Sequence, residues 1–165
     1  MEVQQKTVTI LMADDDEDDS MLVREALAES QLPIKLHIVK NGEELMDYLY
    51  NRGHYIDTNS APFPGLILLD LNMPKKDGLE ALKEIKTDAQ LRRIPVIVLT
   101  TSGAREDIYY TYDLGANSFI VKPMTFTLLV EVMKTIGKYW FEIVELPLGT
   151  AGGRDGQQPH QSSFS

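Results

Sequence analysis

The sequence predicts an α/β protein with a doubly wound parallel sheet of five strands and five helices. Short apolar runs recur along the chain, each is followed by a segment with apolar residues at helical spacing, and no second block of strands follows. Continuous apolar runs are typical of parallel strands buried on both faces. In such a fold the helices cover both faces of the sheet, and reactive groups gather at the carboxyl ends of the strands.

Each predicted strand is a short run rich in aliphatic and β-branched residues. The five runs are Val8–Ala13, Ile34–Val39, Leu66–Leu69, Val96–Thr100 and Asn117–Val121. The third run is the most informative, because the ionisable Asp70 follows it directly and Pro74 then prevents the strand from continuing. Burying a lone carboxylate is costly, so Asp70 needs either a charged partner or metal ion, or hydrogen bonds from nearby backbone N–H groups.

The helices are predicted from start signals, stop signals and apolar spacing. Asn41 precedes Glu44 by three residues, which predicts a helix start, and Gly115 ends the segment Ala104–Leu114 as a C-cap. Residues 53–64 form a polar loop that is longer than usual for such a connection. Apolar residues at helical spacing predict the other three helices. The first has Met21, Leu22, Ala26 and Leu27 and ends before Pro33. The second follows Gly78 and has Leu79, Leu82 and Ile85, and the third follows Thr125 and has Phe126, Leu129, Val130, Val132, Met133 and Ile136.

The composition narrows the class of function. Acidic residues outnumber basic ones by 25 to 16, and this excess argues against broad contact with nucleic acid or anionic membranes. The chain has no cysteine, which excludes thiol catalysis, disulfides and cysteine-ligated metal, and His37, His54 and His160 are too scattered to indicate zinc. No apolar run approaches membrane-spanning length, so we expect a soluble cytoplasmic protein.

Six consecutive acids, Asp14 to Asp19, follow the first predicted strand. We expect residues 16–19 to cap and solvate the start of the first helix. Asp14 and Asp15 differ from these four residues, because they follow the first strand directly and are expected to lie beside Asp70. Two carboxylates about 4 Å apart repel by roughly 4 kcal/mol at an effective dielectric constant near 20. The three carboxylates therefore require a proton or a cation, and an all-oxygen set with open positions suits Mg²⁺.

Thr100 and Lys122 stand at the ends of two further predicted strands. Taken singly, Lys122 would be an ordinary surface charge and Thr100 an ordinary strand end. Together with Asp70 and a Mg²⁺ ion they predict a pocket that accepts a phosphoryl group, in which Asp70 is the nucleophile.

With these motifs the chain resembles, over residues 7–138, the receiver domains of two-component response regulators, the CheY-like superfamily. The motifs are Asp14-Asp15, Leu69-Asp70, Asn72-Met73-Pro74, Asp77-Gly78, Leu99-Thr100-Thr101, Gly115-Ala116 and Lys122-Pro123. The resemblance implies a flavodoxin-like sheet in the order 2-1-3-4-5. It also implies a phosphoacceptor signalling protein, not a classical enzyme, that takes a phosphoryl group on Asp70 from a sensor histidine kinase. We therefore expect a receiver domain at 7–139, an apolar extension at 140–148 and a disordered tail at 149–165.

The resemblance also implies which residues hold the metal ion. Asp15 and Asp70 would bind Mg²⁺ directly, together with the main-chain carbonyl of Asn72. Asp14 would act largely through water.

Further residues are implied to contact the phosphoryl group or to respond to it. Lys122 would contact the group, Thr100 would swing toward it, and Phe119 would rotate inward into the space that Thr100 vacates. The Lys122–Pro123 peptide bond is expected to be cis. Asn72 and Ser102 match the variable positions that tune the lifetime of the phosphoryl group.

A finer resemblance points to one branch of the family, the cyanobacterial phytochrome-associated response regulators, which are single-domain receivers controlled by a light-sensing histidine kinase. It rests on the long loop before Asp70 and on three segments: Pro74-Lys75-Lys76-Asp77-Gly78, Arg93-Ile94-Pro95-Val96, and Trp140-Phe141 with Leu146-Pro147. The kinase partner implied is accordingly a phytochrome.

No DNA-binding or catalytic segment is expected after the receiver, so the output would come from its surface. Tyr109 and Tyr110 are expected near solvent, and with Trp140, Phe141 and Ile143 they would form an apolar patch of the kind found at interfaces. Two interpretations stay open: the extension folds back on its own domain, or it joins the last helix in forming a homodimer.

Two other functions agree less well with the sequence. A phosphatase with an aspartyl nucleophile, like the haloacid-dehalogenase group, needs a second acid two residues after the nucleophile, where this chain has Asn72. A pseudo-receiver that binds partners without phosphorylation is disfavoured by the intact site. An Asp70→Asn variant that signals normally would revive it.

Overall fold

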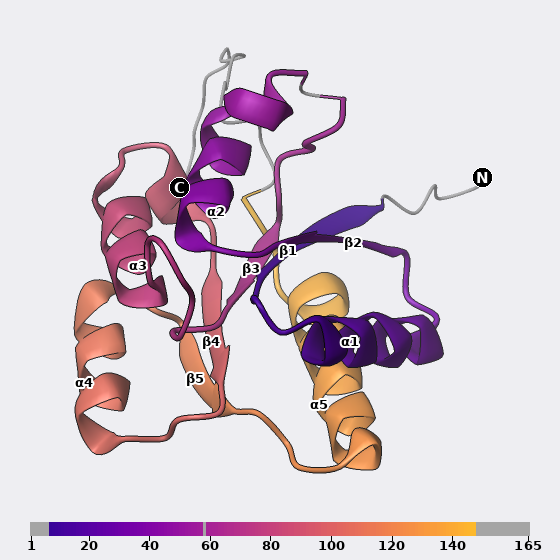
Figure 1. The fold of residues 1–165 in the computed structure, drawn as a ribbon. Helices are drawn as coiled ribbons and strands as arrows, with labels where there is room; N and C mark the ends of the chain where they lie inside the picture. Colours follow the sequence, from indigo (N-terminus) through magenta and orange to yellow (C-terminus); the bar gives the residue numbers. More distant parts are fainter. Residues whose placement is uncertain (1–6, 58, 148–165) are drawn as a thin grey trace, which may run out of the picture.

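The computed structural model describes residues 7–57 and 59–147. Five parallel strands form one sheet in the order β2-β1-β3-β4-β5, which confirms the predicted fold class. The strands are β1 Val8–Ala13, β2 Ile34–Val39, β3 Leu66–Leu69, β4 Val96–Thr100 and β5 Ser118–Val121. The helices are α1 Glu17–Ser30, α2 Gly42–Tyr50, α3 Gly78–Thr87, α4 Arg105–Leu114 and α5 Phe126–Lys138. Figure 1 shows α1 and α5 on one side of the sheet and α2, α3 and α4 on the other.

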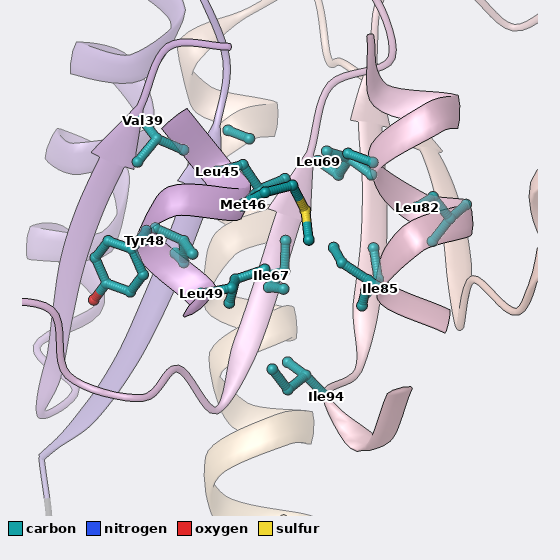
Figure 2. Packing of buried hydrophobic residues seen from close by; sticks show 14 of the residues in the cluster. Val39, Leu45, Met46, Tyr48, Leu49, Ile67, Leu69, Leu82, Ile85 and Ile94 are labelled. Carbon is teal, nitrogen blue, oxygen red and sulfur yellow. The ribbon is translucent and has the colours of Figure 1, made fainter. Parts of the chain in front are cut away.

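The central strands β1, β3 and β4 are buried because helices cover both faces of the sheet, and neighbouring residues of a strand point to opposite faces. Leu11 of β1 and Ile67 of β3 belong to the core beneath α2 and α3, which Figure 2 shows from close by. Ile10 and Leu68, one position along, belong to the second core beneath α1 and α5. Alternate residues of each continuous apolar run thus pack into two separate cores, one on each face of the sheet.

The predicted helix starts and stops are largely confirmed. The Asn41 side chain accepts a hydrogen bond from the backbone N–H of Glu44, and Gly115 ends α4 with a left-handed φ of 113°. The buried face predicted for α1 is partly wrong, because Met21 and Leu22 are 59% and 37% exposed. The face that packs inward instead recurs every three or four residues through Ser20, Val23, Ala26 and Leu27, and Met21 and Leu22 lie to one side of it.

The C-terminal extension begins as a π-helical turn, Tyr139–Ile143, that continues α5. Trp140 and Phe141 are partly buried and pack against the core beneath α1 and α5, so this part of the extension folds back on its own domain. Leu148 and the predicted tail at 149–165 lie outside the described residues. Within the described part of the chain, no helix combines the length and the apolar character needed to cross a membrane.

Candidate functional site

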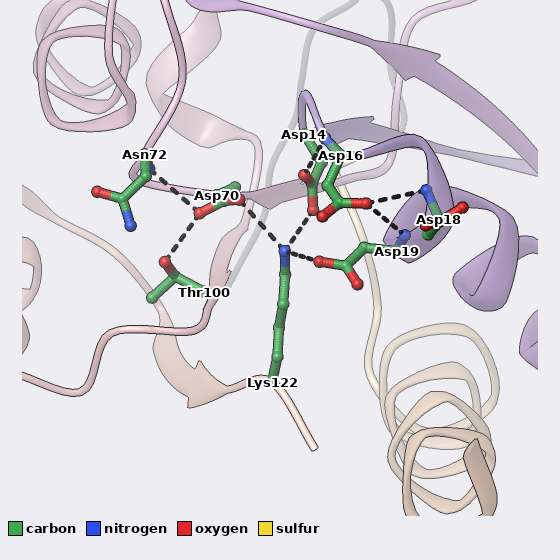
Figure 3. A network of polar contacts seen from close by, with 8 residues as sticks. All are labelled: Asp14, Asp16, Asp18, Asp19, Asp70, Asn72, Thr100 and Lys122. Carbon is green, nitrogen blue, oxygen red and sulfur yellow. Dashed lines mark hydrogen bonds and ion pairs between the residues drawn. The ribbon is translucent and has the colours of Figure 1, made fainter. Parts of the chain in front are cut away.

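The site lies at the carboxyl ends of the strands, where four elements each contribute a polar side chain. Asp14 follows β1, Asp70 follows β3, Thr100 ends β4 and Lys122 follows β5. Figure 3 shows these side chains pointing toward one another across the edge of the sheet. The predicted convergence follows from the topology alone, because all parallel strands end at the same edge.

Asp70 is buried, with 6% of its surface exposed, and each carboxylate oxygen has a partner. Oδ1 accepts hydrogen bonds from the Thr100 hydroxyl at 2.8 Å and from the backbone N–H of Asn72 at 3.1 Å. Oδ2 accepts one from the Lys122 ammonium at 3.2 Å. Asp70 thus has both of the supports that its sequence context allowed, a charged partner and a backbone donor.

Lys122 is the only cation among the side chains drawn in Figure 3. Its ammonium lies 2.6 Å from Asp14 Oδ2, 2.7 Å from Asp19 Oδ2 and 3.2 Å from Asp70 Oδ2. Burial by itself would lower the pKa of Lys122, but hydrogen bonds to Asp14 and Asp19 and the nearby negative charges hold it above its usual value. Lys122 is therefore a permanent positive charge within a group of carboxylates.

Asp14 is almost wholly buried, and burial raises the pKa of its carboxyl group to about 6, although Lys122 and the backbone N–H of Asp16 act in the opposite direction. Its Oδ1 accepts the hydrogen bond from Asp16 at 2.9 Å. The negative charge on Asp14 is consequently unfavourable in the protein alone, and a further cation would favour it.

Asp19 was not predicted to belong to the site. It was expected to be solvated with residues 16–18, and Asp16 does cap α1 by accepting from the backbone N–H groups of Asp18 and Asp19. The first turn of α1 nevertheless places the Asp19 side chain over the end of β1, where it reaches Lys122. Helical geometry is the one feature of the sequence that could have indicated this role for Asp19. Asp19 lies three residues after the N-cap Asp16, almost one helical turn, and so returns to the side of α1 that faces β1.

Asp14, Asp15 and Asp70 each offer a carboxylate oxygen, and the three oxygens lie within 4.8 Å of one another. Asp14 and Asp70 are buried, whereas Asp15 is exposed. This set contains only oxygen ligands and leaves one side open to water, so its chemistry fits a hard divalent cation that keeps several waters, such as Mg²⁺.

The two residues expected to respond to phosphorylation lie on neighbouring strands. The Thr100 hydroxyl already points at Asp70. Phe119 is half-buried against the core beneath α2 and α3, and its backbone N–H donates to the Tyr112 hydroxyl at 3.2 Å.

The expectation of a cis bond before Pro123 is wrong, since the described residues contain no cis peptide bond. The trans form of an X–Pro bond is favoured by about 0.5–1 kcal/mol, and with a trans bond Lys122 already reaches three carboxylates.

The predicted apolar patch is divided in the structure. Tyr109, Tyr110 and Ile143 are 61%, 46% and 60% exposed. Trp140 and Phe141 face their own domain instead. A groove beside them, between β5 and the end of α5, is lined by residues that include Ile120 and Ile136.

The fold and the site together define a receiver, and comparison with known proteins agrees. The model of the response regulator receiver domain family matches residues 10–134, and the chain belongs to this family.

Individual relatives indicate to which branch of this family the chain is similar. The response regulator Rcp1 of Synechocystis sp. (strain ATCC 27184 / PCC 6803 / Kazusa) is 42% identical over 138 residues, which is 84% of this chain and 92% of Rcp1. The crystal structure of the phosphorylated cyanobacterial phytochrome response regulator RcpA has a TM-score of 0.80 and 43% identity, covering 86% of this chain and 99% of that one. The Mn²⁺-bound form of Rcp1 has a TM-score of 0.77 and 41% identity, covering 85% and 99%. The predicted similarity to phytochrome-associated response regulators is therefore confirmed.

Proposed function

We propose that this protein accepts a phosphoryl group on Asp70 from a phosphohistidine of a sensor histidine kinase, in a reaction that requires Mg²⁺. The observation that carries the proposal is the arrangement around Asp70. The carboxylate lies beside two further carboxylates, one ammonium group and one hydroxyl group at the carboxyl ends of the strands. Each of these groups has a function in moving a phosphoryl group, and packing alone does not require them together.

In the transfer, a carboxylate oxygen of Asp70 attacks phosphorus in line with the bond to the imidazole nitrogen. The new O–P bond forms as the N–P bond breaks, and the imidazole nitrogen keeps the electron pair. Lys122, which already lies 3.2 Å from Asp70, is placed to pair with a phosphoryl oxygen. The Thr100 hydroxyl can transfer its hydrogen bond from Asp70 to a phosphoryl oxygen, and Phe119 would then turn inward.

The metal ion would be held by Asp15, Asp70 and the main-chain carbonyl of Asn72, with Asp14 acting through water. When bound, Mg²⁺ supplies positive charge to the oxygens of the transferring group. The donor set supports this assignment, since the three carboxylate oxygens lie within 4.8 Å of one another. The solved Mn²⁺-bound form of Rcp1 is a relative with a divalent cation.

The kinase that we propose as the donor is a phytochrome. The support is the similarity of this chain to the phytochrome response regulator RcpA and to Rcp1. We expect the transfer to take place in the cytoplasm, where histidine kinases have access to ATP, and to involve neither nucleic acid nor a membrane surface. Phosphorylation would switch a protein–protein interaction surface.

Binding of a phosphoryl mimic tests the site. Beryllium fluoride, titrated into isotopically labelled protein and followed by NMR, should shift the amide resonances of Asp70, Thr100 and Phe119 only when Mg²⁺ is present. Asp70→Asn should abolish these shifts, whereas Asp47→Asn, which removes a carboxylate of an exposed ion pair on α2, should retain them. Equal shifts with and without Mg²⁺ would contradict the proposal.

We also propose that the switched surface forms a homodimer through α5 and the extension at 140–148. Two exposed apolar side chains support this: Tyr139, which lines the groove at the end of α5, and Ile143 of the π-helical turn. Light scattering on a sizing column should show a rise from monomer to dimer when beryllium fluoride is added with Mg²⁺, and no rise for Asp70→Ala. A mass unchanged by the mimic would place the output on another partner.

A further inference from the structure

Gly42, the first residue of α2, lies against the backbone of the loop that follows Asp70. It is buried, and its N–H donates a hydrogen bond to the carbonyl oxygen of Lys76 at 2.9 Å. A methyl group at Gly42 would lie 2.1 Å from that oxygen and 2.7 Å from its carbonyl carbon. The obstacle is backbone, so it cannot be relieved by rotating a side chain.

The loop on the other side of this contact connects β3 to α3. It begins at Asp70 and closes at Gly78, whose N–H donates to the carbonyl of Leu71 at 3.0 Å. Within it Lys75 has a left-handed φ of 66°, and the Lys76 side chain forms an ion pair with Glu84 of α3 at 2.6 Å. The loop is thus fixed to α3 at its far end and to α2 at the Lys76 carbonyl.

Asn72 lies in this loop between Leu71, whose carbonyl accepts from Gly78, and Lys76, whose carbonyl contacts α2. Its main-chain carbonyl is the one metal ligand of the proposed site that a side chain does not supply. Its position depends on the path of the loop, whereas Asp14 and Asp70 are placed by strands. A shift at Lys76 would be passed to Asn72 through the few residues that separate them.

We infer that Gly42 is a positioning residue for the metal site: by letting the start of α2 contact the Lys76 carbonyl, it sets the path of the loop that carries Asn72. The inference rests on the proposed function, because it gives Asn72 the role assigned there. It adds a residue on α2 that contacts neither the metal ion nor the phosphoryl group.

The test compares Gly42→Ala with Gly137→Ala, a change in α5 whose added methyl would also be crowded. There the neighbour, 2.3 Å away, is the terminal carbon of the flexible Leu32 side chain. Mg²⁺ binding to metal-stripped protein is measured by titration calorimetry, and folding is checked by circular dichroism. We expect Gly42→Ala to raise the dissociation constant for Mg²⁺ about tenfold or more, as loss of groups that orient ligands does, and Gly137→Ala to leave it within about twofold.

A folded Gly42→Ala protein with the unchanged dissociation constant would overturn the inference. The unchanged protein provides a second measurement that does not depend on the variant folding. In an NMR titration with Mg²⁺ alone, the Gly42 amide resonance should shift along the same curve as that of Asn72. An immobile Gly42 resonance beside a shifting Asn72 resonance would refute the coupling. If the unchanged protein binds no Mg²⁺ at all, the proposed function itself fails.

Discussion

At the scale of single residues, the positive charge of Lys122 offsets part of the negative charge of the carboxylates in the site. Its ammonium is shared by Asp14, Asp19 and Asp70, and only 10% of its side chain is exposed. Buried ion pairs of this kind are costly to break, because the remaining charges stay in a poorly solvated place. Removal of Lys122 is therefore expected to destabilise the metal-free fold, in addition to its effect on the proposed phosphoryl transfer.

Replacing Lys122 by methionine should destabilise the metal-free protein by about 3 kcal/mol, because Asp14 and Asp70 lose their charged partner. Urea unfolding in the presence of a chelator measures the loss. Lys40→Met is the matched control, since its ion pair with Glu17 is largely exposed and solvent screening should leave it little effect on stability. Equal losses in the two variants would show that Lys122 is not needed to balance the acids.

Asp14 predicts a pH dependence of stability. Its pKa in the folded protein is about 6, above the ordinary 3.8, so the folded state binds this proton more tightly than the unfolded state. The stabilisation from Asp14 is therefore fully present below its unfolded pKa and is lost as the pH rises through about 6. The total change is at most about 3 kcal/mol.

The measurement is the free energy of unfolding in chelator from about pH 4 to pH 8, for the unchanged protein and for Asp14→Asn. The difference between the two should change across this range, with the unchanged protein losing stability relative to the variant as the pH rises. Saturating Mg²⁺ should reduce the effect, because a nearby cation favours the ionised form. A difference that does not vary with pH would contradict the raised pKa.

The sequence could predict the site residues that follow strands and missed those placed by a helix turn. Asp14, Asp70, Thr100 and Lys122 stand directly at strand ends, where topology brings them together whatever the details of packing. Asp19 reaches the site only through the pitch and direction of α1, which the run of acids did not reveal.

At the scale of elements, α4 and β5 meet at the exposed side of the sheet. β5 is an edge strand, and the Tyr112 hydroxyl of α4 accepts a hydrogen bond from the backbone N–H of Phe119. This contact joins the helix that presents Tyr109 and Tyr110 to the strand that holds the proposed switch residue. A movement of the Phe119 backbone would therefore displace the Tyr112 side chain of α4.

Tyr112→Phe removes this hydrogen bond and leaves the ring. Loss of one such bond costs about 1 kcal/mol, so the Phe119 amide should exchange its hydrogen with solvent roughly fivefold faster. Tyr110→Phe, which removes a neighbouring phenolic hydroxyl group of the same helix, should leave that rate unchanged. Unchanged exchange in both variants would mean that the Tyr112 hydroxyl does not hold the edge of β5.

The existence and order of the elements could be predicted because each local signal agreed with the others. The Asn41 cap and the Gly115 stop are examples. What could not be predicted depends on how elements pack. Lys86 of α3, for example, donates to the carbonyls of Arg92 and Ile94 at 3.0 and 2.7 Å, and burial lowers the pKa of its ammonium to about 8. Nothing local distinguishes Lys86 from an exposed lysine.

At the scale of the whole molecule, the sheet lies between two cores, and the site lies at the carboxyl ends of its strands. The chain belongs to the receiver family over residues 10–134, and its outputs would be carried by the faces that surround that edge. The alternation of strands and helices predicted a doubly wound parallel sheet, because right-handed crossovers leave few alternatives, and the strand order followed from the resemblance to receiver domains. The partner surface depends on contacts with a second molecule, which local sequence signals do not specify.

The most direct test of the central claim is phosphoryl uptake measured by intact-protein mass spectrometry. The protein is incubated with phosphoramidate, a small donor whose N–P bond resembles that of phosphohistidine, with Mg²⁺ or with a chelator. We predict that one phosphoryl group is gained with Mg²⁺, that none is gained with the chelator, and that Asp70→Asn gains none in either case. A phosphoryl group on Asp70→Asn, or uptake that is equal without Mg²⁺, would contradict the account.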